Sequence, residues 1–472
     1  MLPCAAGCLI ADLAAQSGPP PMARPGVALT NATVIDVRTG TLRPGVTVVI
    51  DGHRIAAVGP VSRVPVPTRA VAVDATGKYV IPGLADTHFH YSDEWATSRL
   101  EPAAYFGWIL AGGVTSVREM SQPGLARVLD LRREAVAGRM PAPRIHVSAG
   151  LDASLDAPWA TLFRRAGTRD AGAALRRLPA AGIDGLKLHN CPRQTMLEAI
   201  GAARAAGVPV YGHTVFGSAD RPPVYENFTL DLVRAGLNGV VHALGTVRPA
   251  GVDDRSAPDL SRTTVEGRRA WRVHNLSAWT RVRPGETQTL IREMVARRVW
   301  YEPTRLVDYY WNHQDRYESP ALPATHPYRT RVRSDGDAET RAAVAALEAA
   351  EAAFIRQFYE AGGLLLAGTD EAPFPPFGVS EEMRLLVEAG VPPHAALQAA
   401  TINAARAMRS EDRPRLGSVD VGKLADLVVL DANPLMDITN VRTIHAVVAD
   451  GRLFDRAALD ELVNRGARQE TA

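Results

Sequence analysis

Lysine is almost absent from this chain of 472 residues. It occurs only at Lys78, Lys187 and Lys423, although lysine and arginine together number 53. The chain therefore uses arginine wherever a generic positive charge is needed. A lysine readily loses its proton and an arginine does not, so a lysine kept inside an apolar strand pattern, as Lys187 is, predicts a chemical role.

Cysteine is equally scarce. The three cysteines, at positions 4, 8 and 191, suit neither a disulfide framework nor a zinc cluster. Two of them lie in residues 1–25, which we interpret as a disordered N-terminal extension or a signal remnant. This segment lacks a basic start, and Asp12 interrupts its short apolar run. We therefore expect a cytoplasmic protein, with a periplasmic or secreted one as the alternative.

Other absences narrow the class of protein. No stretch approaches the roughly 18 to 20 apolar residues that a membrane span needs. A net charge of +2 provides no basic face for a nucleic-acid partner. No glycine-rich phosphate loop follows a predicted strand. With 46% hydrophobic and 22% charged residues, the composition is that of a globular enzyme, and a small molecule is the expected partner.

The two ends of the chain share one pattern. Residues 26–79 and 416–456 are rich in valine, alternate in polarity and break at Asp-Gly or Gly-Lys turns, which is typical of short β-strands. We predict that both ends form a single small β-sandwich domain. Residues 457–472 are then a C-terminal tail.

The middle of the chain, residues 80–415, alternates short apolar segments with Ala- and Arg-rich helical stretches. Eight strands are predicted, at 79–90, 113–120, 144–150, 185–190, 208–214, 239–245, 299–304 and 364–371. An eightfold strand–helix alternation predicts an α/β fold of the (β/α)8 TIM barrel type rather than an open doubly wound sheet.

Polar residues stand at the C-terminal ends of these strands, where the active sites of such barrels lie. His88 and His90 are two residues apart, so strand alternation places both side chains on one face. A lone strand-end histidine is more often a surface residue, and an aspartate there can cap the next helix. Six candidates on one rim instead predict a metal site. They are His88, His90, Lys187, His213, His242 and Asp370.

Two segments make the chain recognisable. IPGLADTHFH (81–90) resembles the HxH signature strand of the amidohydrolase superfamily, and LLLAGTDEAP (364–373) resembles its strand-eight Gly-Thr-Asp. The resemblance runs from about residue 27 to 456 and is greatest to the imidazolonepropionase-like and prolidase-like branch. It implies a metal-dependent hydrolase, for which a homo-oligomer is also expected.

The resemblance also implies roles for the six rim residues. His88, His90 and Asp370 match the ligands of a more buried metal ion, and His213 and His242 match those of a second. Lys187 matches a lysine that carbon dioxide converts to a carbamate, whose two oxygens bridge the two divalent ions. Zinc is the first choice for four imidazoles, with manganese, cobalt or iron as alternatives.

Three further residues are candidate substrate contacts: Tyr91, Arg118 and His189. His189 lies two residues beyond Lys187 and could share its face, so a contact with metal is the alternative. A rim ion pair is the alternative role for Lys187. Imidazolonepropionase resembles a single-metal design without this lysine, so Lys187 argues against a simple transfer of its substrate.

These residues together predict hydrolysis of an amide-type carbon–nitrogen bond in a dipeptide, an N-acyl amino acid or a cyclic amide. Asp370 is the predicted base, taking a proton from the metal-activated water. The alternatives are a lactone, phosphotriester or amino-substituted ring at the same site, and a non-catalytic scaffold. We expect specificity to reside in loops 246–286 and 305–337, with Phe374 and Phe377 as further lining candidates.

Overall fold

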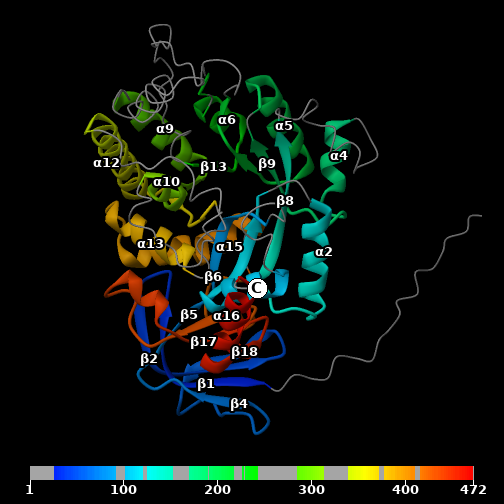
Figure 1. The fold of residues 1–472 in the computed structure, drawn as a ribbon, viewed down its shortest axis with the longest axis vertical. Helices are drawn as coiled ribbons and strands as arrows, with labels where there is room; N and C mark the ends of the chain where they lie inside the picture. The colour runs from blue at the N-terminus through cyan, green and yellow to red at the C-terminus, as the bar shows by residue number, and fades with distance from the viewer. Residues whose placement is uncertain are drawn as a thin grey trace, which may run out of the picture.

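The structure is a computed structural model (Figure 1), in which a small sheet built from both ends of the chain lies below a larger α/β unit. It describes residues 26–91, 101–120, 125–152, 170–189, 191–216, 226–227, 229–242, 284–312, 338–370, 377–409 and 415–470.

Both ends of the chain contribute strands to the small sheet. The strands are β1 (Val27–Asp36), β2 (Thr41–Asp51), β3 (Arg54–Pro60), β4 (Val71–Asp74), β5 (Tyr79–Pro82), β16 (Leu427–Leu430), β17 (Ile444–Ala449) and β18 (Arg452–Phe454). Their order is β18-β17-β16-β5-β1-β2-β3, with β4 paired to β1. The antiparallel pairing of β5 with β16 joins the two ends, with Leu427 opposite Pro82 and Leu430 opposite Tyr79. The prediction of one β unit from both chain ends is confirmed.

The middle of the chain forms a curled sheet of eight parallel strands in chain order. They are β6 (Leu84–Phe89), β7 (Val114–Glu119), β8 (Arg144–Asp152), β9 (Gly185–His189), β10 (Val210–Gly212), β13 (Gly239–Val241), β14 (Trp300–Glu302) and β15 (Leu364–Leu365). Beyond the short β15, Thr87 N donates to Ala367 O at 3.1 Å and Asp370 N donates to His88 O at 2.7 Å. These bonds bring the eighth strand segment onto the first, and the predicted TIM-barrel class is confirmed.

Helices follow the strands around this sheet (Figure 1). They are α1 (Pro102–Ala111), α2 (Leu125–Val136), α4 (Ala171–Arg177), α5 (Arg193–Ala206), α6 (Thr229–Ala235), α9 (Pro284–Ala296), α10 (Arg305–Asn312), α12 (Ala338–Glu360), α13 (Gly378–Glu388), α14 (Pro393–Ala399) and α15 (Ile402–Arg409). In α5, Met196, Ala199, Ile200 and Ala203 are buried at helical spacing, and Gly207 ends the helix with φ +67°. The minor elements are the hairpin strands β11 (Val215–Phe216) and β12 (Glu226–Asn227), and the 3-10 helix η4 (Ile438–Arg442).

The predicted strand 79–90 is two strands that belong to different sheets. Gly83 stands between β5 in the small sheet and β6 in the barrel. A Cβ on Gly83 would lie 2.0 Å from Thr115 Oγ1, so the backbone can cross there only as glycine.

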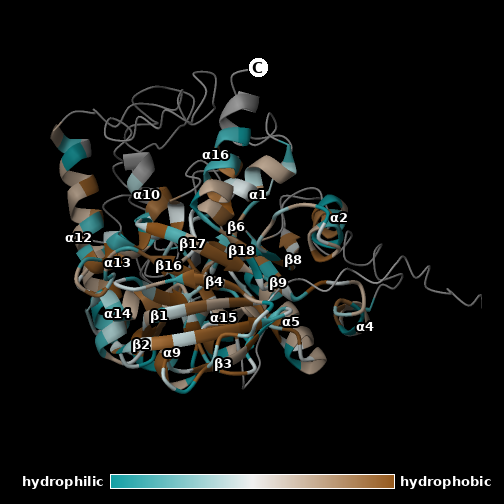
Figure 2. Ribbon diagram, turned by 90° about the horizontal axis from the view of Figure 1, so that it is seen from below, coloured by the Kyte–Doolittle hydropathy of each residue, from teal (hydrophilic) through white to brown (hydrophobic). Residues whose placement is uncertain are grey.

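Of the residues predicted as a C-terminal tail, 457–470 belong to helix α16 (Arg456–Glu470). Trp108 Nε1 on α1 donates to Val463 O at 2.8 Å. Leu462 packs on Gly107, where an added Cβ would lie 3.2 Å from its side chain. Figure 2 shows apolar strands inside and hydrophilic stretches on surrounding helices. No helix in the described ranges is both long and apolar enough to cross a membrane.

Candidate metal centre

Three of the predicted ligands meet where β6 and the β15 segment end. Asp370 Oδ1 lies 2.8 Å from His88 Nε2 and 3.1 Å from His90 Nε2. The three ligand atoms all lie within 4.8 Å of one another. His88 is fully buried and His90 nearly so. Two imidazoles and a carboxylate converging in this way have the chemistry and the spacing to hold a divalent metal ion.

The other two predicted imidazoles form a pair beside this group. His213, after β10, and His242, after β13, have their Nε2 atoms 2.9 Å apart. His242 Nδ1 lies 2.7 Å from Thr304 Oγ1 and 3.6 Å from Asp370 Oδ2. The pair is therefore next to the carboxylate of the first group, as a second ion at one site would require.

Lys187 on β9 contacts the same group of residues. Its side chain is 2% exposed, and its Nζ lies 3.1 Å from His88 Nε2. Burial lowers the pKa of Lys187 from 10.5 to about 8. Lys187 therefore has more of the neutral amine that carbamate formation requires than an ordinary lysine has at the same pH. All six predicted rim residues are brought together.

Burial also sets the protonation of the imidazoles. It lowers the pKa of His90 to about 4 and holds the pKa values of His213 and His242 well below their usual range. Burial alone would raise the pKa of Asp370, but the neighbouring His242 and His88 hold it well below its usual range. Neutral imidazoles around an ionised carboxylate are the forms in which these groups bind metal.

Three residues of the site have left-handed backbone conformations. The φ angles are +67° at His242, +51° at Thr304 and +58° at Asp370. Such conformations are unfavourable for residues other than glycine and persist only where the surroundings impose them. Here His242 N donates to Glu302 O at 2.9 Å, and Asp370 N donates to His88 O. The strain therefore orients two of the candidate ligands.

Asp86 holds two strands of the site together, a role that the sequence analysis did not assign. Its Oδ1 accepts from the backbone N of His88 and of Thr369, both at 3.0 Å, and its Oδ2 accepts from Thr369 Oγ1 at 2.7 Å. Burial raises the pKa of Asp86 to about 7. The signal was present, because Asp86 precedes the HxH pair within the same motif.

Glu302 was also missed. It is the last residue of β14 and is fully buried, with Oε2 at 3.4 Å from His88 Nδ1. The strand VWYEPT was predicted, and an acidic residue at its C-terminal end is the feature that could have marked Glu302 as part of the site.

The three candidate substrate contacts lie in different settings. His189 is exposed, with its ring 4.4 Å from that of His213, so it remains a candidate. Tyr91 is 4% exposed and stacks on Phe106 at 5.7 Å between ring centroids. Arg118 is 1% exposed and lies beneath the site. Tyr91 and Arg118 are therefore buried against protein groups, and their contact with substrate stays a prediction.

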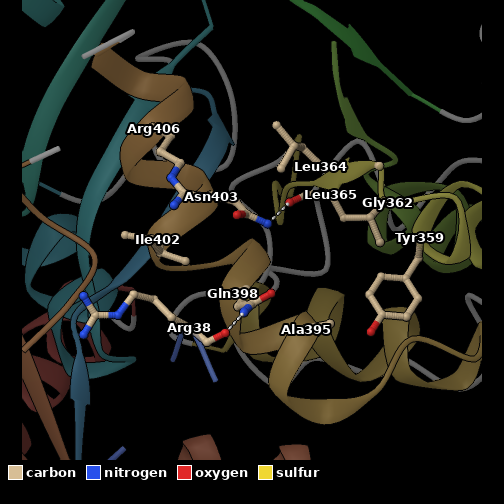
Figure 3. A pocket seen from close by; sticks show the side chains of 11 residues that line it. Arg38, Tyr359, Gly362, Leu364, Leu365, Ala395, Gln398, Ile402, Asn403 and Arg406 are labelled. Carbon is tan, nitrogen blue, oxygen red and sulfur yellow. Dashed lines mark hydrogen bonds between the residues drawn. The ribbon is translucent and has the colours of Figure 1, made fainter. Parts of the chain in front are cut away.

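Most of the predicted specificity loops fall outside the described residues. This applies to 246–283, 313–337 and Phe374, whereas 284–286 begin α9, 305–312 form α10, and Phe377 is exposed before α13. A pocket of about 280 Å³ is lined by Leu364, Asn403 and Arg406, among others (Figure 3). It adjoins the start of β15, whereas Asp370 follows the end of that strand. The pocket is therefore at the opposite end of the barrel from the candidate metal centre.

Comparison with known proteins agrees with the fold. Residues 261–454 match the family described as the Amidohydrolase family. This segment includes the eighth strand with Asp370 and the return of the chain into the small sheet. The predicted resemblance to the amidohydrolase superfamily is confirmed for this segment of the chain.

Curated relatives carry a more particular name. Adenine deaminase 2 of Agrobacterium fabrum is 44% identical over 92 residues, which are 19% of this chain and 14% of that protein. Adenine deaminase of Serratia proteamaculans is 25% identical over 416 residues, 86% of this chain and 53% of that protein. The chain thus spans about half the length, or less, of these two curated relatives.

The solved structures agree in fold. A Xaa-Pro dipeptidase with bound methionine in its active site is 20% identical, with a TM-score of 0.61, and the match covers 91% of this chain and all of that one. At this identity the likeness establishes the barrel and its attached sheet alone. The solved structure therefore supports the predicted fold class.

Proposed function

We propose that this chain hydrolyses an amide-type carbon–nitrogen bond of a small molecule at a site for two divalent metal ions, with zinc as the first choice. His88, His90 and Asp370 would hold one ion, and His213 and His242 the other. The amide of a dipeptide, an N-acyl amino acid or a cyclic amide is the proposed substrate.

The observation that carries the proposal is the convergence on Asp370. Its two carboxylate oxygens face different imidazoles, since Oδ1 lies 2.8 Å from His88 and Oδ2 lies 3.6 Å from His242. A purely structural aspartate would need neither a group of buried neutral imidazoles nor a left-handed backbone. The arrangement fits a carboxylate that contacts both metal positions.

Lys187 supports the two-metal form of the proposal. Its Nζ lies beside His88, and its charge helps to lower the pKa values of His90, His213 and His242. A carbamate at this nitrogen would supply two anionic oxygens to the site. An arginine could not form one, which agrees with the retention of lysine here in a chain that otherwise avoids it.

The chemical roles then divide among the residues of the site. Bound divalent ions supply a Lewis acid for the scissile carbonyl and bring the pKa of water toward neutrality. Asp370 is proposed to accept the proton of the attacking water and return it to the leaving amine. Asp86 keeps Asp370 and the HxH pair in register by bonding both strands. His189 at the mouth is proposed to contact the substrate.

A second candidate function is hydrolytic removal of an amino group from a nitrogen heterocycle. The curated relatives named adenine deaminase favour it. The two candidates share the same carbon–nitrogen bond cleavage and differ in whether an amine or ammonia leaves.

A substrate panel on metal-reconstituted protein tests the proposal. Dipeptides, N-acyl amino acids and cyclic amides are compared with adenine, lactones and phosphotriesters. Turnover of an amide-type substrate that disappears with a chelator and returns with zinc supports the first function. Release of ammonia from adenine alone replaces it with the second, and a protein that binds no metal contradicts both.

Two variants test the roles of individual residues. Lys187→Ala should lose metal and activity, and a short carboxylic acid added to the buffer should restore part of both by occupying the space of the carbamate. Full metal content and activity without the additive would contradict the carbamate bridge. Asp370→Asn should bind metal weakly and turn over slowly, and near-full turnover with normal metal content would remove it as the base.

A further inference from the structure

A buried ion pair lies directly beneath the candidate metal centre. Arg118 Nη2 on β7 lies 3.0 Å and 3.2 Å from the two carboxylate oxygens of Glu302 on β14. The two side chains are 1% and 0% exposed. Removing both charges from water is costly, and an apolar pair in such a place is often equally or more stable. Stability alone therefore does not account for this pair.

Glu302 contacts both groups of candidate ligands. Its carboxylate Oε2 lies 3.4 Å from His88 Nδ1, the ring nitrogen on the far side from Asp370. Its main-chain oxygen accepts a hydrogen bond from His242 N at 2.9 Å. A displacement of Glu302 would therefore shift candidate ligands of both metal positions.

Arg118 fixes Glu302 from the opposite side. Its Nε donates to Thr87 O at 2.8 Å, which ties it to the strand that carries His88. Its guanidinium lies over the adjacent rings of Tyr211 and Trp300, at 4.3 Å and 4.5 Å from their centroids. These contacts leave little freedom to a side chain that would otherwise have many rotamers.

Gly368 provides the space in which Glu302 and His88 meet. An added Cβ at this position would lie 2.6 Å from Glu302 Oε1, 2.6 Å from His88 Cβ and 2.9 Å from His88 N. Any side chain here would have to push the carboxylate and the imidazole apart. The absence of a side chain at Gly368, two residues before Asp370, thus allows Glu302 and His88 to lie close together.

We propose that Glu302 is a positioning residue that accepts the Nδ1–H of His88 and so directs the Nε2 of that ring toward Asp370 and the metal. Arg118 neutralises the buried carboxylate and holds it in place. A metal-binding imidazole needs its second nitrogen bonded in this way, because that bond fixes the tautomer and the ring orientation. The inference rests on the proposed metal site.

The test compares metal affinity with the stability of the metal-free protein. Glu302→Gln keeps the size of the side chain and removes its charge. Zinc affinity, measured by competition with a chelating dye, should fall roughly 10- to 100-fold, the usual effect of losing such a partner. Urea unfolding of the metal-free variant serves as the second readout.

A matched control is available in the same chain. Glu351 on α12 is also buried, and it pairs with the buried Arg305 at 3.4 Å. Glu351→Gln should therefore disturb folding to a similar degree, whereas its zinc affinity should remain that of the wild type. Arg118→Lys, which retains the charge and loses the donation from Nε to Thr87 O, should fall between Glu302→Gln and the wild type in zinc affinity.

The outcomes separate this inference from the proposed function. Wild-type zinc affinity in Glu302→Gln overturns the inference, as does an equal loss of affinity in Glu351→Gln. A wild type that binds no zinc overturns the inference together with the metal site. A wild type that binds zinc and cleaves no substrate of the panel contradicts only the proposed activity, and the comparison of affinities is then still decisive for Glu302.

Discussion

Replacing Glu382 with alanine should destabilise the protein by about 2–6 kcal/mol. Glu382 lies on α13 and is fully buried. Its Oε1 accepts from Arg305 N at 3.1 Å, and its Oε2 accepts from Leu306 N at 2.7 Å. These are the first two residues of α10, so a side chain from another helix provides the cap that the start of α10 needs.

The magnitude follows from the two amides that would be left without a partner. An unsatisfied buried donor costs roughly 1–3 kcal/mol, and two of them give the range above. Arg305 would retain its bond from Nη1 to Leu385 O at 2.7 Å, so the helix should shift rather than detach. Thr304 precedes it directly and lies 2.7 Å from His242 Nδ1, so activity should fall as well.

The measurement is urea unfolding of Glu382→Ala beside Glu388→Ala. Glu388 lies on the same helix, is exposed and pairs with Arg384, so its loss should cost less than about 0.5 kcal/mol. A free energy of unfolding for Glu382→Ala within about 0.5 kcal/mol of that control would refute the reasoning. Equal activity of the two variants would refute the connection to His242.

Three further predictions concern pH, metal and packing. Burial raises the pKa of Glu382 from 4.5 to about 8 in the folded protein. Its contribution to the free energy of unfolding is therefore full below about pH 4.5 and is lost as the pH rises through 8. Glu382→Gln should make the unfolding free energy depend less on pH in this range, and an unchanged slope would contradict the prediction. Removing metal with a chelator should lower the melting temperature, since an ion at 100 times its dissociation constant contributes about 2.7 kcal/mol, and calorimetry with and without zinc measures this. Leu462→Ala should cost roughly 2–5 kcal/mol by opening a cavity between α16 and α1 at Gly107, and denaturant unfolding that matches the wild type would show that α16 contributes no stability.

Much of the fold was predictable because its signals are local. Each of the eight barrel strands is an apolar segment followed by a helical pattern, and all eight are present in the structure near their predicted positions. The division at Gly83 was not predictable, because it depends on the approach of Thr115 from a distant segment. Helix α16 was not predicted for a similar reason, because it packs on α1, which lies far from it in the sequence.

The candidate ligands were predictable because metal chemistry restricts the residue types and the barrel restricts their place. His88 and Asp370 needed only a strand end and a motif. Asp86 and Glu302 stood in a motif and at a strand end that could have marked them, yet their partners on other strands are not encoded by any spacing in the sequence. Arg118 stands on a predicted strand, yet its burial under the site depends on Glu302 opposite it. The left-handed backbone at His242 likewise follows from tertiary contacts.

The seam between β5 and β16 has a consequence for the synthesis of the protein. Tyr79 leaves the ribosome long before its neighbour Leu430 is made, and at roughly 5–20 residues per second the interval is some tens of seconds. During that time β5 has an open edge facing the place of the missing strand. The barrel segment is thus complete before the sheet that adjoins it, and a nascent chain halted before residue 427 would leave that edge exposed to other chains.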